Sequence, residues 1–111
     1  MQSKVAVIIT SPDVDVAWTG LFYAIKGTRN CFMGDLRLVL WGPAERTIAE
    51  TAELQEMVKE YKGLGRQVFA CRTCSDRYGV TEDMEKLGCR VDYVGSIVSQ
   101  WVKDGFMLFN W

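Results

Sequence analysis

Short apolar runs alternate with amphipathic segments along the whole chain. The first run, KVAVII at residues 4–9, is β-branched and nearly continuous, which is typical of a strand covered on both faces in a parallel sheet. Comparable runs occur at residues 35–41, 67–70, 90–94 and 106–111. The pattern therefore predicts five strands with helical sequence between them.

Two long segments between the strands place apolar residues at helical spacing. The first, at residues 15–29, predicts an amphipathic helix. The second, at residues 44–62, begins after Gly42-Pro43 and ends at Gly63, and its glutamates are expected on the outer face. The expected inner positions are Val16, Ala17, Leu21, Ala24 and Ile25 in the first helix, and Ile48, Ala52, Leu54, Met57, Val58 and Tyr61 in the second.

Three shorter helices are expected in the second half of the chain. One runs through residues 75–78, one covers residues 81–87, and one follows from residue 96. Thr81 and Ser96 are expected to cap the first turns of the last two helices, and Gly88 is expected to end the middle one. The last helix is expected to pass through Val98, Trp101 and Val102.

Strands that alternate with helices are typical of an α/β protein. We expect a single domain over residues 1–111, built as a three-layer α/β/α sandwich with a mostly parallel five-stranded sheet. Ligands of such sheets bind beyond the carboxyl ends of the strands, and Cys71, the first residue after the third predicted strand, falls at this edge. The edge is expected to contain residues 11–15, 42–45, 71–76 and 95–97.

Composition narrows the classes of function. The chain has 111 residues, of which 49% are hydrophobic and 24% charged, with a net charge of −1, which argues against intrinsic disorder and against a nucleic-acid ligand. The first apolar run is too short for a signal peptide or a membrane span, so a cytoplasmic location without a membrane partner is expected. The absence of histidine removes Ser-His and Cys-His catalysis. No G-x-G-x-x-G motif or Walker A lysine is present, so no cofactor is expected.

The stretch FACRTCSDRYG, residues 69–79, carries the candidate chemistry. Cys71 and Cys74 form a CxxC pair, and the start of the following helix, together with Arg72 and Arg77, favours a thiolate at Cys71. Simple packing is the competing interpretation, because cysteine is among the most buried residue types.

Two other uses of the CxxC pair are less favoured. A thioredoxin-like dithiol needs a proline that faces the disulfide, whereas Pro12 and Pro43 lie in turns near other strands. A zinc site would need two further ligands, and Cys31 and Cys89 are isolated, so no metal is expected.

Apolar side chains outside the expected core indicate self-association. Phe32 and Met33 fall in a loop, and the chain ends in Phe109 and Trp111, whereas Phe106 is expected to belong to the core. This is more apolar surface than a small monomer hides at its periphery. We therefore expect a homo-oligomer.

The chain resembles the DsrE/DsrF-like family, which includes the DsrE and TusD sulfur-relay subunits. The resemblance rests on Cys71 directly after the third strand, followed eight residues later by Gly79, with Arg77 between them. It extends to the opening strand with its TSPD turn, to LRLVLWGPA and to the closing DGFMLFNW. The resemblance implies a five-stranded sheet between helices, assembly into trimers or hexamers, and a cysteine that carries sulfur as a persulfide between donor and acceptor proteins.

The leading hypothesis is a sulfur carrier or sulfur-relay component that acts through Cys71. The Cys71 thiolate would attack a donor persulfide, hold the sulfane sulfur, and be attacked in turn by an acceptor thiol. The alternatives are a non-catalytic module that binds a small ligand or a partner protein at the sheet edge, and a dithiol redox protein in which Cys74 is the resolving thiol. The residues expected to shape or support the pocket are Arg72, Ser75, Arg77, Gly79, Ser11, Gly42 and Ser96.

Overall fold

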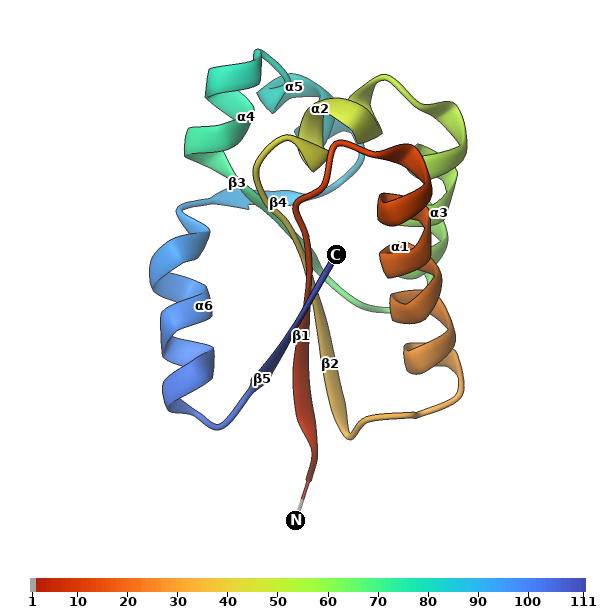
Figure 1. The fold of residues 1–111 in the computed structure, drawn as a ribbon, viewed down its shortest axis with the longest axis vertical. Coiled ribbons are helices and arrows are strands. Elements are labelled where there is room, and N and C mark those ends of the chain that lie inside the picture. The colour runs from red at the N-terminus through yellow and green to blue at the C-terminus, as the bar shows by residue number, and fades with distance from the viewer. Residues whose placement is uncertain (1) are drawn as a thin grey trace.

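The computed structural model describes residues 2–111, which form an α/β fold around a five-stranded sheet (Figure 1). The order of strands across the sheet is β4-β3-β2-β1-β5, and all neighbouring pairs are parallel. The predicted fold class is confirmed, and the sheet is fully rather than mostly parallel. The strands are β1 (Lys4–Ile9), β2 (Asp35–Leu40), β3 (Val68–Cys71), β4 (Arg90–Asp92) and β5 (Met107–Asn110).

The helices form the outer layers of the sandwich and cover one end of the sheet. Helices α1 and α3 lie on one face, α6 lies on the other, and α2, α4 and α5 gather at the carboxyl ends of the strands (Figure 1). None of the helices within residues 2–111 has the length and apolar character to cross a membrane. The helices are α1 (Val14–Arg29), α2 (Ala44–Ala49), α3 (Ala52–Gly63), α4 (Arg72–Tyr78), α5 (Thr81–Lys86) and α6 (Val94–Lys103).

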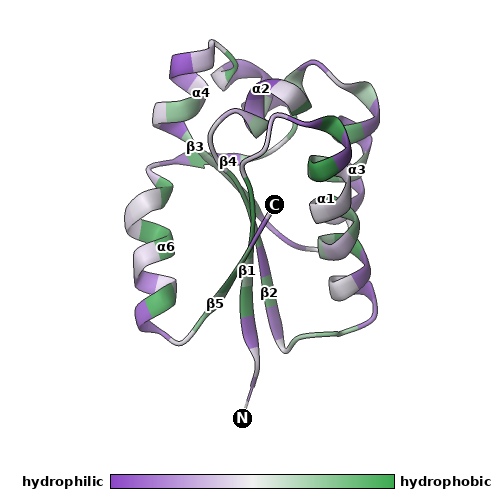
Figure 2. Cartoon of the chain, in the orientation of Figure 1, coloured by the Kyte–Doolittle hydropathy of each residue, from purple (hydrophilic) through white to green (hydrophobic). Residues whose placement is uncertain are grey.

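The internal strand β1 is buried on both faces, which explains its unbroken apolar sequence. Val5, Val7 and Ile9 belong to the core under α1 and α3, whereas Ala6 and Ile8 belong to the core under α6. In Figure 2 the strands carry long apolar stretches, whereas the helices carry both apolar and polar residues. Alternate residues of one strand therefore tie the two outer layers to the same sheet.

The helix predicted over residues 44–62 is two helices. Thr51 has φ −126° and ψ 105°, an extended conformation that ends α2 and starts α3 in a new direction. The Gln55 side-chain amide donates hydrogen bonds to the carbonyls of Ile48 and Ala49, which satisfies the end of α2. The prediction that Ala52 faces inward is wrong, because the break leaves it exposed.

The two predicted serine and threonine caps are also wrong. Thr81 is the first residue of α5, and its hydroxyl is bonded to the Ser75 hydroxyl at 2.7 Å instead of capping the helix. The N-cap of α6 is Tyr93, and Ser96, already inside the helix, donates to the Tyr93 carbonyl. Helix α6 starts earlier than predicted because β4 ends at Asp92.

Several apolar side chains remain on the surface. Val16, which was expected to face inward, is 38% exposed, Val102 of α6 is 48% exposed, and Phe32 is 56% exposed. Phe106 is buried as expected, and Trp111 is half-buried against the core.

Candidate functional site

Cys71 lies at the carboxyl end of β3, at the edge where the topology of a parallel sheet places ligands. It is the last residue of the strand, paired with Asp92 of β4, rather than the first residue after it. Helix α4 begins at Arg72, so Cys71 also occupies its N-cap position. The Cys71 side chain is only 5% exposed and belongs to the apolar cluster between the sheet and α6.

Cys74 lies in the first turn of α4 and faces Cys71. Both thiols are free, and Cys74 packs against the apolar cluster that contains Cys71. Burial is the main reason why the pKa of Cys74 is raised, and the contact with Cys71 and the nearby charge of Glu45 add to it. The backbone N–H of Gly42 lies against the Cys74 sulfur and opposes this increase in pKa. Cys74 is therefore held as a neutral thiol in the folded protein.

Glu45, in the first turn of α2, is a buried acidic group beside these thiols. Its side chain is 0% exposed, and neither carboxyl oxygen has a hydrogen-bond partner of ordinary geometry within residues 2–111. Burial raises the pKa of Glu45 from 4.5 to about 8, although a backbone group of Cys71 lies close enough to lower it in part. The carboxyl group is therefore mostly neutral at pH 7 and ionises one pH unit higher.

The turn between β2 and α2 fixes the position of Glu45. The Ala44 N–H donates to the Thr10 carbonyl at 3.1 Å, and the Thr47 hydroxyl donates to the Pro12 carbonyl at 2.8 Å. These bonds hold α2 against the loop that follows β1. Gly42, with φ 72°, allows the sharp exit from β2 because glycine adopts this left-handed conformation without strain.

Glu45 was assigned to the outer face of a helix by the sequence pattern, and this assignment is wrong. A signal was nevertheless present, because Glu45 stands three positions before Ile48, which was correctly placed inside. Residues three apart lie on the same side of a helix. A charged residue on the inner side of the first helical turn that follows a buried strand therefore indicates a buried charged group.

Among the other predicted site residues, the structure brings Gly42 to the thiol pair and directs most of the others to different contacts. Ser75 is fully buried, and its hydroxyl donates to the Arg72 carbonyl, while the Arg72 guanidinium donates to the Val91 carbonyl on β4. The remaining contacts are those of Arg77 with the Tyr78 ring, of Ser11 with the Asp13 backbone N–H, of Ser96 with the Tyr93 carbonyl, and of Gly79 as the left-handed end of α4.

The other two cysteines lie apart from this pair. Cys31 is exposed in the loop after α1, whereas Cys89 is buried, which raises the pKa of its thiol to about 12. Within residues 2–111, no three or more Cys, Asp or Glu side chains are arranged to hold a metal ion.

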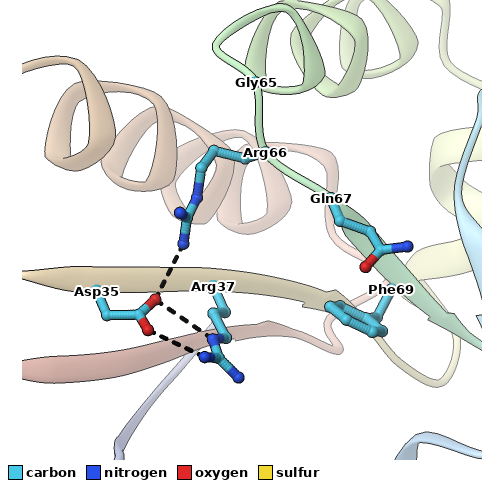
Figure 3. A pocket seen from close by; sticks show the side chains of 6 residues that line it. All are labelled: Asp35, Arg37, Gly65, Arg66, Gln67 and Phe69. Atoms are coloured by element: carbon cyan, nitrogen blue, oxygen red, sulfur yellow. Dashed lines mark hydrogen bonds and ion pairs between the residues drawn. The ribbon is translucent and has the colours of Figure 1, made fainter.

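A separate pocket lies at the amino ends of β2 and β3 (Figure 3). The Asp35 carboxylate accepts hydrogen bonds from Arg37 and Arg66, each at 3.0 Å. Burial raises the pKa of Asp35, but the two guanidinium groups outweigh it, so the pKa is lowered. The pocket is at the opposite end of the strands from the thiol pair and its lining contains no nucleophile. Its volume is about 270 Å³, and it is lined by Asp35, Arg37, Gly65, Arg66, Gln67 and Phe69.

Comparison with known proteins identifies the fold. No protein-family model matches the chain, and no curated protein matches it in sequence. The structure is similar to that of BT1422, a conserved protein of unknown function from Bacteroides thetaiotaomicron, with a TM-score of 0.89 and 22% identity over 98% of this chain and 95% of that one. It is also similar to the ychN protein from E. coli, with a TM-score of 0.74 and 20% identity over the full length of both chains. At these identities the likeness establishes the α/β fold.

Proposed function

We propose that the protein is a sulfur carrier that holds sulfur as a persulfide on Cys71. The supporting observation is that Cys74 packs against the apolar cluster of Cys71 at the carboxyl edge of the sheet, and that the buried Glu45 lies on α2, which packs against the helix of Cys74. The resemblance of the sequence around Cys71 to the DsrE/DsrF-like family, which includes sulfur-relay subunits, points to the same chemistry.

The proposed reaction is a thiol exchange in two steps. The Cys71 thiolate attacks the outer sulfur of a donor persulfide, the donor S–S bond breaks, and the donor cysteine leaves as a thiolate. An acceptor thiolate then attacks the outer sulfur on Cys71 and takes it away, which restores the Cys71 thiolate. The apolar cluster around Cys71 includes Val94 and is flanked by Trp41, and it would protect the persulfide from water between the steps.

Intact-mass spectrometry after incubation with glutathione persulfide tests this proposal. We expect the protein to gain one sulfur atom, and Cys71→Ser to gain none. Cys31→Ser is the matched control, because Cys31 is an exposed thiol in the loop after α1 and not part of the CxxC pair. Its removal should leave the gain of one sulfur atom unchanged. A protein that gains no sulfur, or gains it equally without Cys71, would contradict the proposal and favour the non-catalytic binding module.

A dithiol redox function is the second candidate, because the free thiols Cys71 and Cys74 share one apolar cluster. In that case the two thiols would cycle as a disulfide with the loss of two hydrogens. Counting free thiols across a titration with reduced and oxidised glutathione tests it. A fully reduced pair at every ratio would exclude this function.

We also propose that the chain forms a homo-oligomer, a trimer or hexamer, as the resemblance implies. Trp18 and Phe22 stack on each other at 5.0 Å between ring centroids while both stay exposed, and Met107 and Leu108 are exposed on the edge strand β5. Exposed apolar patches of this kind mark association surfaces. Sedimentation analysis should show a mass of three or six chains, and a monomer at micromolar concentration would contradict the proposal.

A further inference from the structure

Glu45 has no part in the sulfur transfer proposed above, yet its position is unfavourable for stability. The side chain is fully buried, and both of its oxygens lack a hydrogen-bond partner among the described residues. A buried polar group without a partner destabilises a folded protein, and an unpaired buried charge does so more strongly. A group placed in this way at the ligand edge of the sheet calls for an explanation.

Helix α2, which carries Glu45, packs against α4, which carries Cys74. A backbone group of Cys71 on β3 lies close to the carboxyl group, and the charge of Glu45 acts on Cys74 of α4 and on Cys89 before β4. Within residues 2–111, no lysine or arginine forms an ion pair with Glu45. Lys62 of α3 acts on Cys89 and donates a hydrogen bond to the Gly88 carbonyl.

We propose that Cys74 is the thiol that resolves sulfur-modified Cys71, and that Glu45 accepts the proton which Cys74 must lose. The modified form of Cys71 on which Cys74 acts is a persulfide or a mixed disulfide. The inference rests on the proposed reactivity of Cys71 toward sulfur and assigns a role to the second thiol and to the carboxyl group.

The proposed step balances without any further reactant. The Cys74 proton passes to the Glu45 carboxylate, and the Cys74 sulfur attacks the Cys71 sulfur. A Cys71–Cys74 bond forms, the bond from Cys71 to its outer sulfur breaks, and the outer group leaves with the electron pair as hydrosulfide or as a thiolate. An external dithiol then returns the disulfide to two thiols by donating two electrons and two protons.

The properties of the two groups fit this assignment. Cys74 is a poor nucleophile by itself, since burial and the neighbouring thiol keep it protonated. A general base works best when its pKa is close to the working pH, and burial brings the pKa of Glu45 to about 8. Cys71 is the N-cap of α4, and Cys74, three residues later, packs against the same apolar cluster, so the reacting sulfur atoms need no large movement.

Glutathione disulfide is the probe for this step, followed by acid quenching and intact-mass spectrometry. In the wild type we expect a short-lived glutathione adduct, then a protein that has lost two hydrogens. Cys74→Ser should stop at the adduct. Glu45→Gln should form the adduct but convert it to the disulfide about 100-fold more slowly near pH 7.5, the typical size of general-base catalysis. Glu50→Gln, the same change on an exposed glutamate at the end of α2, should convert it at the wild-type rate.

The pH profile separates proton transfer from a structural effect. The wild-type conversion rate should rise with pH and level off above about 8, where Glu45 is ionised. In Glu45→Gln this inflection should be lost, and Glu45→Asp should restore it in part. Equal rates and profiles for the wild type and Glu45→Gln, or a wild type that forms no Cys71–Cys74 disulfide, would overturn the inference. Loading of Cys74→Ser from glutathione persulfide tests the proposed function separately, because it does not need the resolving thiol.

Discussion

Replacing Glu45 with glutamine should stabilise the folded protein at neutral pH. The wild-type side chain is fully buried, and burial raises the pKa of its carboxyl group from 4.5 to about 8. Glutamine has nearly the same shape and stays neutral at every pH. The substitution therefore removes the free-energy cost of holding an ionisable acid in a buried site and leaves the packing almost unchanged.

The size of the effect follows from the two pKa values. Below pH 4.5 the carboxyl group is protonated in both the folded and the unfolded chain, so ionisation contributes no difference. Between 4.5 and about 8 the folded protein keeps a proton that the unfolded chain has released, and the free energy of unfolding falls as the pH rises. At 1.36 kcal/mol for each pH unit, the loss reaches about 3 kcal/mol at pH 7 and about 5 kcal/mol above pH 8.

Urea denaturation followed by circular dichroism at a series of pH values measures this difference. We expect the Glu45→Gln and wild-type curves to agree near pH 4 and to separate steadily up to pH 8, with the variant more stable. Glu50→Gln should stay within about 0.5 kcal/mol of the wild type, because Glu50 is exposed. A constant difference between wild type and Glu45→Gln across this pH range would refute the reasoning.

Four further substitutions, one of them a control, test other parts of the fold, and each is measured as a change in the free energy of unfolding in urea. Gly79→Ala should destabilise the protein by about 1–2 kcal/mol, because Gly79 has φ 69°, although no atom lies within 4 Å of the added Cβ. Gly63→Ala is the control: its added Cβ is equally unobstructed, but Gly63 is helical, so this change should stabilise the protein by about 0.5–1 kcal/mol. Stability changes of the same sign in the two variants would contradict the argument. Tyr61→Phe should cost about 1 kcal/mol through loss of the buried hydrogen bond to the Leu36 carbonyl, and no change would show that water replaces it. Trp101→Ala should cost about 3–5 kcal/mol, because Trp101 is buried between α6 and the sheet; a cost below 1 kcal/mol would contradict this packing.

The sequence pattern predicts the layers of the fold well, because a strand buried on both faces has a continuous apolar sequence. β1 reads as an unbroken apolar run since its alternate residues face two different cores. The break in the helix predicted over residues 44–62 is harder to recognise in the sequence. Ile48 before the break and Leu54 and Val58 after it are all buried, and Ala52 between them is also apolar, so apolar residues recur on both sides of Thr51 although the chain changes direction there.

The position of Cys71 was predictable, whereas the burial of Glu45 was indicated only by its spacing from Ile48. Cys71 follows from topology, because the end of any parallel strand falls at the ligand edge. The burial of Glu45 depends on where the broken helix places its first turn, and on the packing of α2 against the loop after β1 and against α4. Such contacts between distant segments are set by the three-dimensional fold, and residue type alone favours exposure for glutamate.

The two expected effects of Glu45→Gln have opposite signs, and this opposition distinguishes a functional carboxyl group from a structural one. A structural carboxylate stabilises the fold through its partners, so its loss should lower stability and any activity together. Glu45 lacks such partners among residues 2–111, so its loss should raise stability. If the same variant is also slow to form the Cys71–Cys74 disulfide, the slower reaction cannot be attributed to a weakened fold. Sites that perform chemistry often lower the stability of the fold, and a buried titratable group near two thiols that destabilises the protein fits this pattern.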